Sequence, residues 1–402
     1  MARSLRIGVV GGGIGGLAAA RAMLMRGMEV VVFEQASGLT EFGGGLVLTP
    51  NALIALRALG LEERALADGF QSTSQVVRSW RSGRVILRNS FDRYRALFGA
   101  SSATIHRGDM QRLLAEFVPA GALRLASRCT EVESRPHAAV ARFADGSEFE
   151  ADIIIGADGI HSAVRSSTFG PENAHFTGLM CWRGLVDSRQ LPRGLVAPEQ
   201  SAWWGPHGHV VHYYVRRGAL LNWVAHIETD SWREESWSTP GHIPELLDTY
   251  KHWNHQLTRI FEATGPCYKW ALYDRDPLRA WSRGRVTLLG DSAHAMLPYL
   301  AQGAAQSIED ACVLAAVLAE APQEPEAALK RYETLRLPRT SRIQLGARER
   351  GRINHLSSRW SRFKRDASIV CHNWIGAKSG PQDIGWIYKY DAGCVPTEEL
   401  VA

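Results

Sequence analysis

The hydrophobic pattern near the start of the chain predicts a strand, a tight turn, a helix and a second strand. Residues 5–10 form a short apolar, partly β-branched run, which is typical of a buried strand. Glycines follow, and residues 17–26 are rich in Ala, Leu and Met, which favours a helix. Residues 29–34 are again apolar and β-branched, and they end in a carboxylate. This order predicts a βαβ unit of about 30 residues.

Later segments repeat these signals. They predict a strand and a helix at 101–117, a hairpin at 142–150 around Asp145-Gly146, and buried strands at 151–157 and 285–289. Helices are predicted at 306–319 and over 325–368, where one face is basic. Strands that alternate with helices in this way predict an α/β fold.

The pattern changes between about 180 and 275, where strand-like segments such as 209–215 replace the helical ones. We expect a β-rich second domain here, joined by residues near 72–98. Most tryptophans fall in this region, where they fill the core, which is the commoner role, or line an aromatic pocket: Trp182, Trp203, Trp204, Trp223, Trp232, Trp237, Trp253 and Trp270.

Composition narrows the function classes. Of 402 residues, 45% are hydrophobic and 22% are charged, as in an ordinary globular enzyme. The net charge of +5 mildly favours anionic ligands, but no basic stripe accompanies a nucleic-acid motif, so we expect no nucleic-acid partner. The six cysteines form no C-x-x-C pair, which argues against a metal site or dithiol chemistry and favours free thiols in a reducing cytosol.

The apolar, Gly-rich run at 7–20 resembles a signal peptide in composition alone. However, charged residues follow at once, and no run approaches the roughly 20 apolar residues of a membrane span: Arg21, Arg26, Glu29 and Glu34 come next. We therefore expect a cytoplasmic protein without an integral membrane segment.

The first chemical motif is Gly11-x-Gly13-x-x-Gly16, between the first strand and its helix. Gly11 permits the turn, Gly13 lets the backbone approach a pyrophosphate, and Gly16 allows close helix–sheet packing. The helix N-terminus then faces the anion. Glu34, about 18 residues later, is placed to accept hydrogen bonds from a ribose 2′-hydroxyl and would repel a 2′-phosphate. An ordinary Gly-rich loop would not explain Glu34, so we predict a dinucleotide site suited to FAD or NAD.

The second motif follows a buried strand at 152–156. The strand ends in Asp158-Gly159, and Ser162 begins a short helix. A turn and a helix cap would account for these residues, but not for the ordered spacing through to Arg165.

The third motif is another strand end followed by a Gly-rich turn into a helix: Gly290-Asp291, His294, Pro298, Gly303 and Asp310. An aspartate at such a switch point is able to hydrogen-bond a polyol hydroxyl. The helix that opens near Gln302-Gly303 offers backbone N–H groups to a flavin ring oxygen.

Together the three motifs resemble the single-component (class A) FAD-dependent aromatic hydroxylases, in particular salicylate hydroxylase, 3-hydroxybenzoate 6-hydroxylase and 6-hydroxynicotinate 3-monooxygenase. The resemblance covers about residues 5–390 and includes further motifs: Gly43-Gly-Gly45-x5-Asn51, His106-Arg107-x-Asp109, Trp182-Arg183-Gly184, Tyr273-Asp274-Arg275 and Pro298-Tyr299-Leu-Ala-Gln302-Gly303. It implies a flavoprotein monooxygenase that hydroxylates a small aromatic substrate through a flavin C4a-hydroperoxide. It also implies tightly bound FAD and transient NADH or NADPH, and the chain carries no second dinucleotide fingerprint.

The resemblance implies a fold like that of para-hydroxybenzoate hydroxylase. This is a Rossmann-like FAD-binding domain with an inserted β-sheet substrate domain and C-terminal helices. A chain of 402 residues is long for one core, in agreement with this division. We expect the FAD-binding domain at 1–70, 100–178 and 276–368, the substrate domain at 71–99 and 179–275, and a C-terminal tail at 369–402.

The resemblance also implies cofactor contacts, residue by residue. The first motif would hold the ADP half of FAD, with Gly11, Gly13, Gly16 and Glu34 as the expected contacts. Arg107 would reach the ribityl–pyrophosphate region, and Asp291 would bind the ribityl chain. Asp158 would touch FAD and influence NAD(P)H binding, and Pro298 to Gly303 would lie beside the isoalloxazine ring.

The chemistry requires an electron-rich ring, usually a phenol that becomes a phenolate. Ionising a phenol with a pKa of about 10 at pH 7 costs about 4 kcal/mol, so a base or a positive field is needed. Alternation puts His209, Val211 and Tyr213 on one strand face and His212 on the other. The resemblance matches His209 and Tyr213 to substrate-pocket positions. We expect His209 as base or phenolate orienter and Tyr213 as hydrogen-bond partner, against the alternative that each is simply a polar strand residue.

Two departures from the related enzymes bear on the substrate. Val47 and Tyr299 each stand where the 6-hydroxynicotinate enzyme has a histidine, which favours a benzenoid acid over a pyridine acid. His294 is expected to be structural or near the flavin. Arg183 is expected to be a carboxylate or flavin partner, or else a structural ion-pair residue.

We therefore expect hydroxylation of a phenolic aromatic carboxylate, salicylate- or hydroxybenzoate-like, with loss of carbon dioxide if the substrate is salicylate-like. The alternatives are a hydroxypyridine carboxylate substrate, a flavin oxidase or dehydrogenase on the same fold, and a non-catalytic FAD-binding protein. The aromatic substrate and dioxygen are the expected partners. For the basic C-terminal helices, a homodimer interface, a membrane surface and simple solvation all remain open.

Overall fold

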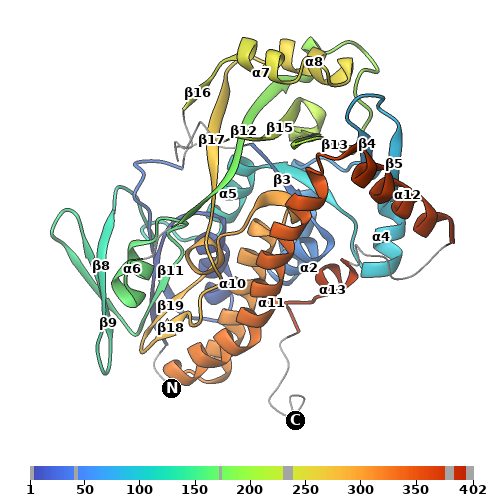
Figure 1. Ribbon diagram of the computed structural model, residues 1–402. Helices are drawn as coiled ribbons and strands as arrows, with labels where there is room; N and C mark the ends of the chain where they lie inside the picture. The colour runs from blue at the N-terminus through green and yellow to red at the C-terminus, as the bar shows by residue number, and fades with distance from the viewer. Residues whose placement is uncertain (1–3, 40–43, 172–173, 230–238, 376–383, 395–402) are drawn as a thin grey trace.

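The computed structural model of the protein describes residues 4–39, 44–171, 174–229, 239–375 and 384–394. Two main sheets, of six and eight strands, organise these residues (Figure 1). Gly43, Trp232, Trp237 and the parts of the expected tail at 376–383 and 395–402 lie outside the described residues.

The six-stranded sheet is built from strands far apart in the sequence. Its order is β18 (Ser282–Arg283), β19 (Val286–Leu288), β11 (Ile153–Gly156), β1 (Arg6–Val10), β2 (Glu29–Phe33) and β7 (Leu123–Arg124). All neighbouring pairs are parallel except β18 and β19. Because β1, β11 and β19 run in the same direction, their carboxyl ends meet at one edge of the sheet, where ligands bind in such folds.

Both faces of this sheet are covered, which explains why its central strands are apolar throughout. On one face, α1 (Ile14–Leu24) packs against β1 and β2, and α10 (Gly303–Glu320) packs against α1. On the other lies a three-stranded antiparallel sheet: β10 (Glu148–Ala151), β9 (Ala139–Phe143) and β8 (Cys129–Ser134). The predicted hairpin around Asp145-Gly146 joins β9 and β10.

The eight-stranded sheet is mainly antiparallel. Its order is β16 (Pro240–Gly241), β17 (Cys267–Asp274), β12 (His175–Asp187), β15 (Leu220–Glu228), β14 (Gly208–Val215), β13 (Gln200–Gly205), β4 (Ser74–Ser79) and β5 (Val85–Ser90). Its only parallel pair in the described chain is β13–β4. Two helices, α7 (Ile243–Thr249) and α8 (His255–Glu262), cover one face, as Figure 1 shows at the top. Trp182, Trp203, Trp223 and Trp253 fill the core under them, in the commoner role expected for these tryptophans.

The remaining elements connect the two sheets. A two-stranded sheet pairs β3 (Gly45–Leu48) with β6 (Ala103–His106). Short helices and 3-10 turns fill the connections: α2 (Pro50–Ala58), α3 (Glu62–Asp68), α4 (Phe91–Phe98), α5 (Arg107–Ala115), α6 (Ala163–Phe169), α9 (Asp291–His294), η1 (Ser188–Gln190), η2 (Arg216–Gly218) and η3 (Pro298–Leu300).

Three helices end the described chain: α11 (Pro325–Asn354), α12 (Arg359–Ile375) and α13 (Gly385–Tyr388). The long helix α11 packs on α10 and η3, and it runs along both main sheets in Figure 1. The predicted α/β fold with C-terminal helices is confirmed. The expected domain division stays a proposal, although two of its boundaries, at 178 and 369, fall inside β12 and α12. Across the described ranges, no helix has the length and apolar character that crossing a membrane requires.

Candidate active site

One large cavity, of about 1760 Å³, lies between the two main sheets. From the six-stranded sheet it is lined by residues at the carboxyl ends of strands, and from the eight-stranded sheet by residues of β14. The first group includes Gly11, Glu34, Asp158 and Asp291, and the second His209, Val211 and Tyr213. The structure therefore brings the three motifs and the predicted strand face to one place.

The glycine loop has the geometry that its spacing predicts. Gly11 adopts a positive φ of 111°, which favours glycine. A Cβ on Gly16 would lie 1.9 Å from the carbonyl oxygen of Gly11, so only glycine allows this packing. A Cβ on Gly13 would meet nothing within 4 Å, because this residue faces the cavity.

Glu34 and the start of α1 suit the ADP half of a flavin dinucleotide. The Glu34 carboxylate accepts hydrogen bonds from the backbone N–H of Gly12 and of Ala36, both at 2.8 Å. A carboxylate accepts about four hydrogen bonds, so two remain for a ribose. At the N-terminus of α1, no side chain of the described residues caps the first turn, so its backbone N–H groups are available to a phosphate.

The second motif holds the third in place. Asp158 accepts hydrogen bonds from the hydroxyls of Ser162, at 2.5 Å, and Ser292, at 3.1 Å. Ser162 also caps α6 by accepting from the N–H of Arg165, at 2.8 Å, so the predicted cap is present. The Arg165 guanidinium donates to the carbonyl of Ser292 at 2.9 Å. These bonds explain the ordered spacing: Arg165 ties the turn after β11 to the turn after β19.

The third motif faces the middle and far end of the cavity. Asp291 lines the cavity, and desolvation by the surrounding protein raises the pKa of its carboxyl group. The nearby His294 and Arg107 oppose that rise. Arg107 and Asp291 both line the cavity, as do Pro298 and Gly303. The start of α10 has no side-chain cap from the described residues, so its N–H groups are available to a ring oxygen. These donors and acceptors fit FAD.

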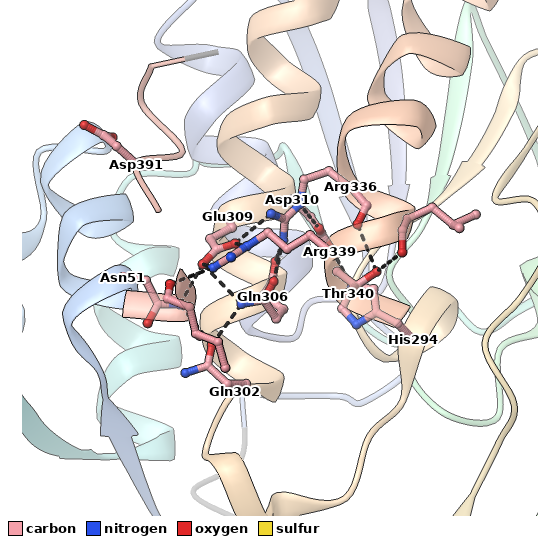
Figure 2. A network of polar contacts seen from close by, with 12 residues as sticks. Asn51, His294, Gln302, Gln306, Glu309, Asp310, Arg336, Arg339, Thr340 and Asp391 are labelled. Atoms are coloured by element: carbon pink, nitrogen blue, oxygen red, sulfur yellow. Dashed lines mark hydrogen bonds and ion pairs between the residues drawn. The ribbon is translucent and has the colours of Figure 1, made fainter. Parts of the chain in front are cut away.

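A buried polar network joins the first turns of α10 to α2 and α11 (Figure 2). Arg336 of α11 bonds Asp310 at 2.7 Å and Glu309 at 2.6 Å, with all three side chains fully buried. Asn51 bridges Glu309, at 2.6 Å, to Gln302, at 2.9 Å. Burial alone would raise the pKa of Asp310, but the cationic partners more than offset this and lower it.

His294 belongs to this network and not to the cavity wall. Its Nε2 lies 2.6 Å from an oxygen of Asp310, and the side chain is buried. Of the two roles expected for His294, the structural one matches these contacts.

Three histidines and a tyrosine form a cluster at the substrate-sheet end of the cavity. The rings of His209 and His226 stack at 4.4 Å, because the two residues pair across β14 and β15. Nδ1 of His209 lies 2.6 Å from Nε2 of His355. The ring of Tyr299 meets those of His209, His226 and His355 edge-on, at 5.2, 5.5 and 5.6 Å.

Burial keeps this cluster neutral. It lowers the pKa of His209 well below its ordinary value, that of His226 to about 3 and that of His355 to about 4, and the neighbouring histidines add to the shift of each. Burial raises the pKa of the Tyr299 phenol. Within the described chain, neither Nδ1 of His226 nor the Tyr299 hydroxyl has a hydrogen-bond partner. Two buried polar atoms beside the cavity are thus left without a hydrogen-bond partner among the described residues.

The strand alternation expected for β14 holds in the structure. His209, Val211 and Tyr213 line the cavity, whereas His212 lies on the other face and accepts a hydrogen bond from Trp203 at 3.0 Å. The Tyr213 hydroxyl donates to the carbonyl of Gly45 at 2.8 Å, and the partner of His209 is His355. The catalytic roles of His209 and Tyr213 stay predictions.

Cations and aromatic rings complete the cavity wall. Arg183 lies 4.2 Å from the centre of the Trp270 ring, and burial lowers the pKa of its guanidinium to about 10. Val47, Trp204 and Trp270 also line the cavity, so two of the named tryptophans take the pocket-lining role. Among the described residues, no group of three or more His, Cys, Asp or Glu side chains is placed to hold a metal ion.

Sequence reasoning missed His226 and His355. His226 carried a signal, because strand pairing of 220–228 with 208–215 would place it beside His209. His355 carried none that spacing could reveal, because it follows the end of α11 and reaches the site only through tertiary packing.

Comparison with known proteins defines the class. Residues 4–345 match the family described as FAD binding domain, so the chain belongs to that family. It is 39% identical over 395 residues to 3-amino-4-hydroxybenzoate 2-monooxygenase of Streptomyces platensis, covering 97% of each chain. It is 34% identical over 403 residues to 6-hydroxynicotinate 3-monooxygenase of Pseudomonas fluorescens, covering 99% of this chain and 98% of that one. The protein is an FAD-dependent aromatic monooxygenase of class A, as the motifs indicated.

Solved structures agree with this assignment. A salicylate hydroxylase substrate complex superposes with a TM-score of 0.82 at 27% identity, covering 97% of this chain and 96% of that one. HpxO of Klebsiella pneumoniae, complexed with FAD and uric acid, superposes with a TM-score of 0.84 at 25% identity, covering 92% and 94%. The predicted family, fold and FAD cofactor are confirmed.

Proposed function

We propose that this enzyme hydroxylates the ring of a phenolic aromatic carboxylate, salicylate- or hydroxybenzoate-like, with NAD(P)H and dioxygen as co-substrates. One observation carries the proposal: a single cavity joins the groove at Gly11 to the sheet face that carries His209. An aromatic ring held at His209 therefore shares a chamber with bound FAD. The name of the Streptomyces platensis relative makes 3-amino-4-hydroxybenzoate the first substrate to test.

Bound FAD, reduced by NAD(P)H, supplies the activated oxygen, and the chain's own residues hold and polarise the ring. Since Nδ1 of His209 is engaged by His355, its Nε2 is the nitrogen left for a substrate hydroxyl. His209 is neutral at pH 7, and when its Nδ1–H donates to His355 the lone pair on Nε2 accepts the hydroxyl proton. Developing phenolate charge favours the protonated imidazole, which offsets its low pKa as the ring becomes electron-rich. Val211, Val224 and Trp270 line the cavity with apolar side chains.

The test is NADH and NADPH oxidation by the FAD-loaded protein against a panel of acids, with the product mass measured. The panel contains 3-amino-4-hydroxybenzoate, salicylate, 3- and 4-hydroxybenzoate, and 6-hydroxynicotinate. We expect a benzenoid acid to accelerate NAD(P)H oxidation and to gain one oxygen atom. For a salicylate-like substrate the mass also shows whether carbon dioxide leaves.

The oxidase alternative gives the opposite pattern. If no acid stimulates NAD(P)H oxidation while another donor reduces the flavin, the proposal fails. Stimulation by 6-hydroxynicotinate alone would support the hydroxypyridine alternative.

Three finer points stay predictions. The choice between NADH and NADPH is decided by the same assay. A cytoplasmic location is supported by six free cysteines, four of them buried, as expected in a reducing compartment. A homodimer is tested by the molar mass in solution.

A further inference from the structure

One partly buried arginine of the cavity wall has no partner among the residues that the structure describes. Arg350, near the end of α11, lines the cavity and is only partly exposed. Within the described ranges of the chain it makes no hydrogen bond, ion pair or ring contact, whereas Arg348, two residues earlier, is paired with Asp274 and Asp276. Burial lowers the pKa of Arg350, and the nearby Tyr388 and Tyr94 oppose this.

A cation in this position costs free energy unless an anion compensates it. The protein has exposed sites for arginine along α11, such as Arg352, whose side chain is 82% exposed. A partly buried, unpaired guanidinium that faces a cavity is therefore best explained by a ligand that carries a negative charge.

The surroundings of Arg350 suit an aromatic ligand. Tyr94, Phe98, Tyr388 and Trp386 line the same part of the chain's cavity wall, and the rings of Tyr94 and Tyr388 lie 5.6 Å apart. Asn354, four residues after Arg350 and so on the same helix face, also lines the cavity. Among the described residues its Oδ1 has no hydrogen-bond partner.

Arg350 shares its cavity with the histidine cluster. His209 and Arg350 both line the cavity, and His355, which contacts His209, follows Arg350 by five residues, about 7.5 Å along a helix axis. A ligand in this cavity therefore has access both to His209 and to Arg350.

We propose that Arg350 binds the carboxylate of the aromatic substrate, with Asn354 as a polar neighbour. The inference rests on the proposed function for the identity of the substrate, but not for the existence of the anion site. Arg350 determines specificity because it selects acids over neutral phenols. Guanidinium and carboxylate form two parallel hydrogen bonds, which lysine cannot reproduce.

The test is equilibrium binding, which needs no turnover. Oxidised, FAD-loaded protein is titrated with 4-hydroxybenzoate and with 4-hydroxybenzamide, its uncharged isostere, and the flavin absorbance is followed. We expect the wild type to prefer the acid by about 10- to 100-fold, the range for a hydrogen bond to a charged group. Arg350→Met should abolish this preference, and Arg350→Lys should retain part of it.

Arg352→Met is the matched control, because it removes an exposed charge two residues away and should leave the preference intact. FAD content and the melting temperature confirm that each variant is folded. The proposal is overturned if Arg350→Met weakens both probes equally, if the wild type shows no preference, or if the variant loses affinity for NADH and not for the acid. Lost preference without hydroxylation of any acid would uphold the anion site and refute the proposed function.

Discussion

At the scale of the residue, His209 is held in one orientation by its neighbours. His355 occupies Nδ1, and His226 stacks on the ring at 4.4 Å. A histidine fixed on both sides presents the same nitrogen to every ligand, so the geometry of proton transfer is set before the substrate arrives.

His209→Gln should remove the proton acceptor while retaining a polar side chain. We expect kcat to fall by about 10²- to 10⁴-fold, the usual contribution of a general base, and the bound phenol to lose its phenolate absorbance. The measurement is steady-state turnover at pH 7 with ultraviolet difference spectra of the substrate complex.

His212→Gln is the control for this variant, because His212 lies one residue from the cavity-lining Val211 but bonds to Trp203 on the opposite face. It should lower the melting temperature and leave the phenolate spectrum unchanged. Equal loss of turnover in both variants would mean that His209 acts only in folding.

At the scale of the element, two glycines near the turn between β1 and α1 should serve different purposes, Gly16 in folding and Gly13 in cofactor binding. Gly16→Ala would force a Cβ to within 1.9 Å of the Gly11 carbonyl oxygen, so we expect destabilisation by about 1–3 kcal/mol or more. Gly13→Ala meets no atom of the protein within 4 Å. It should leave the melting temperature of the apoprotein unchanged and weaken FAD binding at least fivefold, which matches about 1 kcal/mol at a helix N-terminus.

Thermal melting of the apoproteins and fluorescence titration with FAD distinguish the two variants. If the Gly13 variant melted early without FAD and the Gly16 variant did not, the assignment of the two glycines would be reversed.

The sequence predicts those parts of the site that depend on local geometry and not those that depend on contacts between distant residues. The turns at Gly11, Asp158 and Asp291 follow buried strands, and spacing along the chain is enough to predict them because their geometry is local. The contact between His209 and His355 joins residues 146 positions apart. Arg350 likewise reaches the cavity only because α11 packs on α10 and η3. Such contacts depend on tertiary packing, about which the local sequence pattern carries no information.

At the scale of the whole molecule, the buried histidines couple stability to pH. The folded state lowers the pKa of His212 and His226 to about 3 and that of His355 to about 4, and it holds the pKa of His209 well below its ordinary value, whereas an unfolded histidine titrates near 6.5. The unfolded chain therefore takes up protons below about pH 6.5 that the folded protein does not bind. Stability is complete above that pH and falls as the pH decreases towards the folded values.

Each histidine should contribute about 1.4 kcal/mol of lost stability per pH unit in this window. We expect the free energy of unfolding in urea to decrease steeply between pH 6.5 and pH 5. In His226→Phe, which retains an aromatic ring in the stack, the slope should be shallower by about that amount. A free energy of unfolding that stays constant from pH 7 to pH 5 would contradict this account.

Neighbouring strands of the six-stranded sheet come from distant parts of the sequence, which has a consequence for synthesis of the protein in the cell. Strand β11 ends at residue 156 and its neighbour β19 ends at residue 288, so 132 residues separate the two ends. At about 5–20 residues per second, translation takes about 7 to 26 seconds to supply β19 after β11. During that time β11 is left with an unpaired edge, which is open to association with other chains. FAD therefore joins a site that is completed only after most of the chain, up to Asp291 and Gly303, has been synthesised.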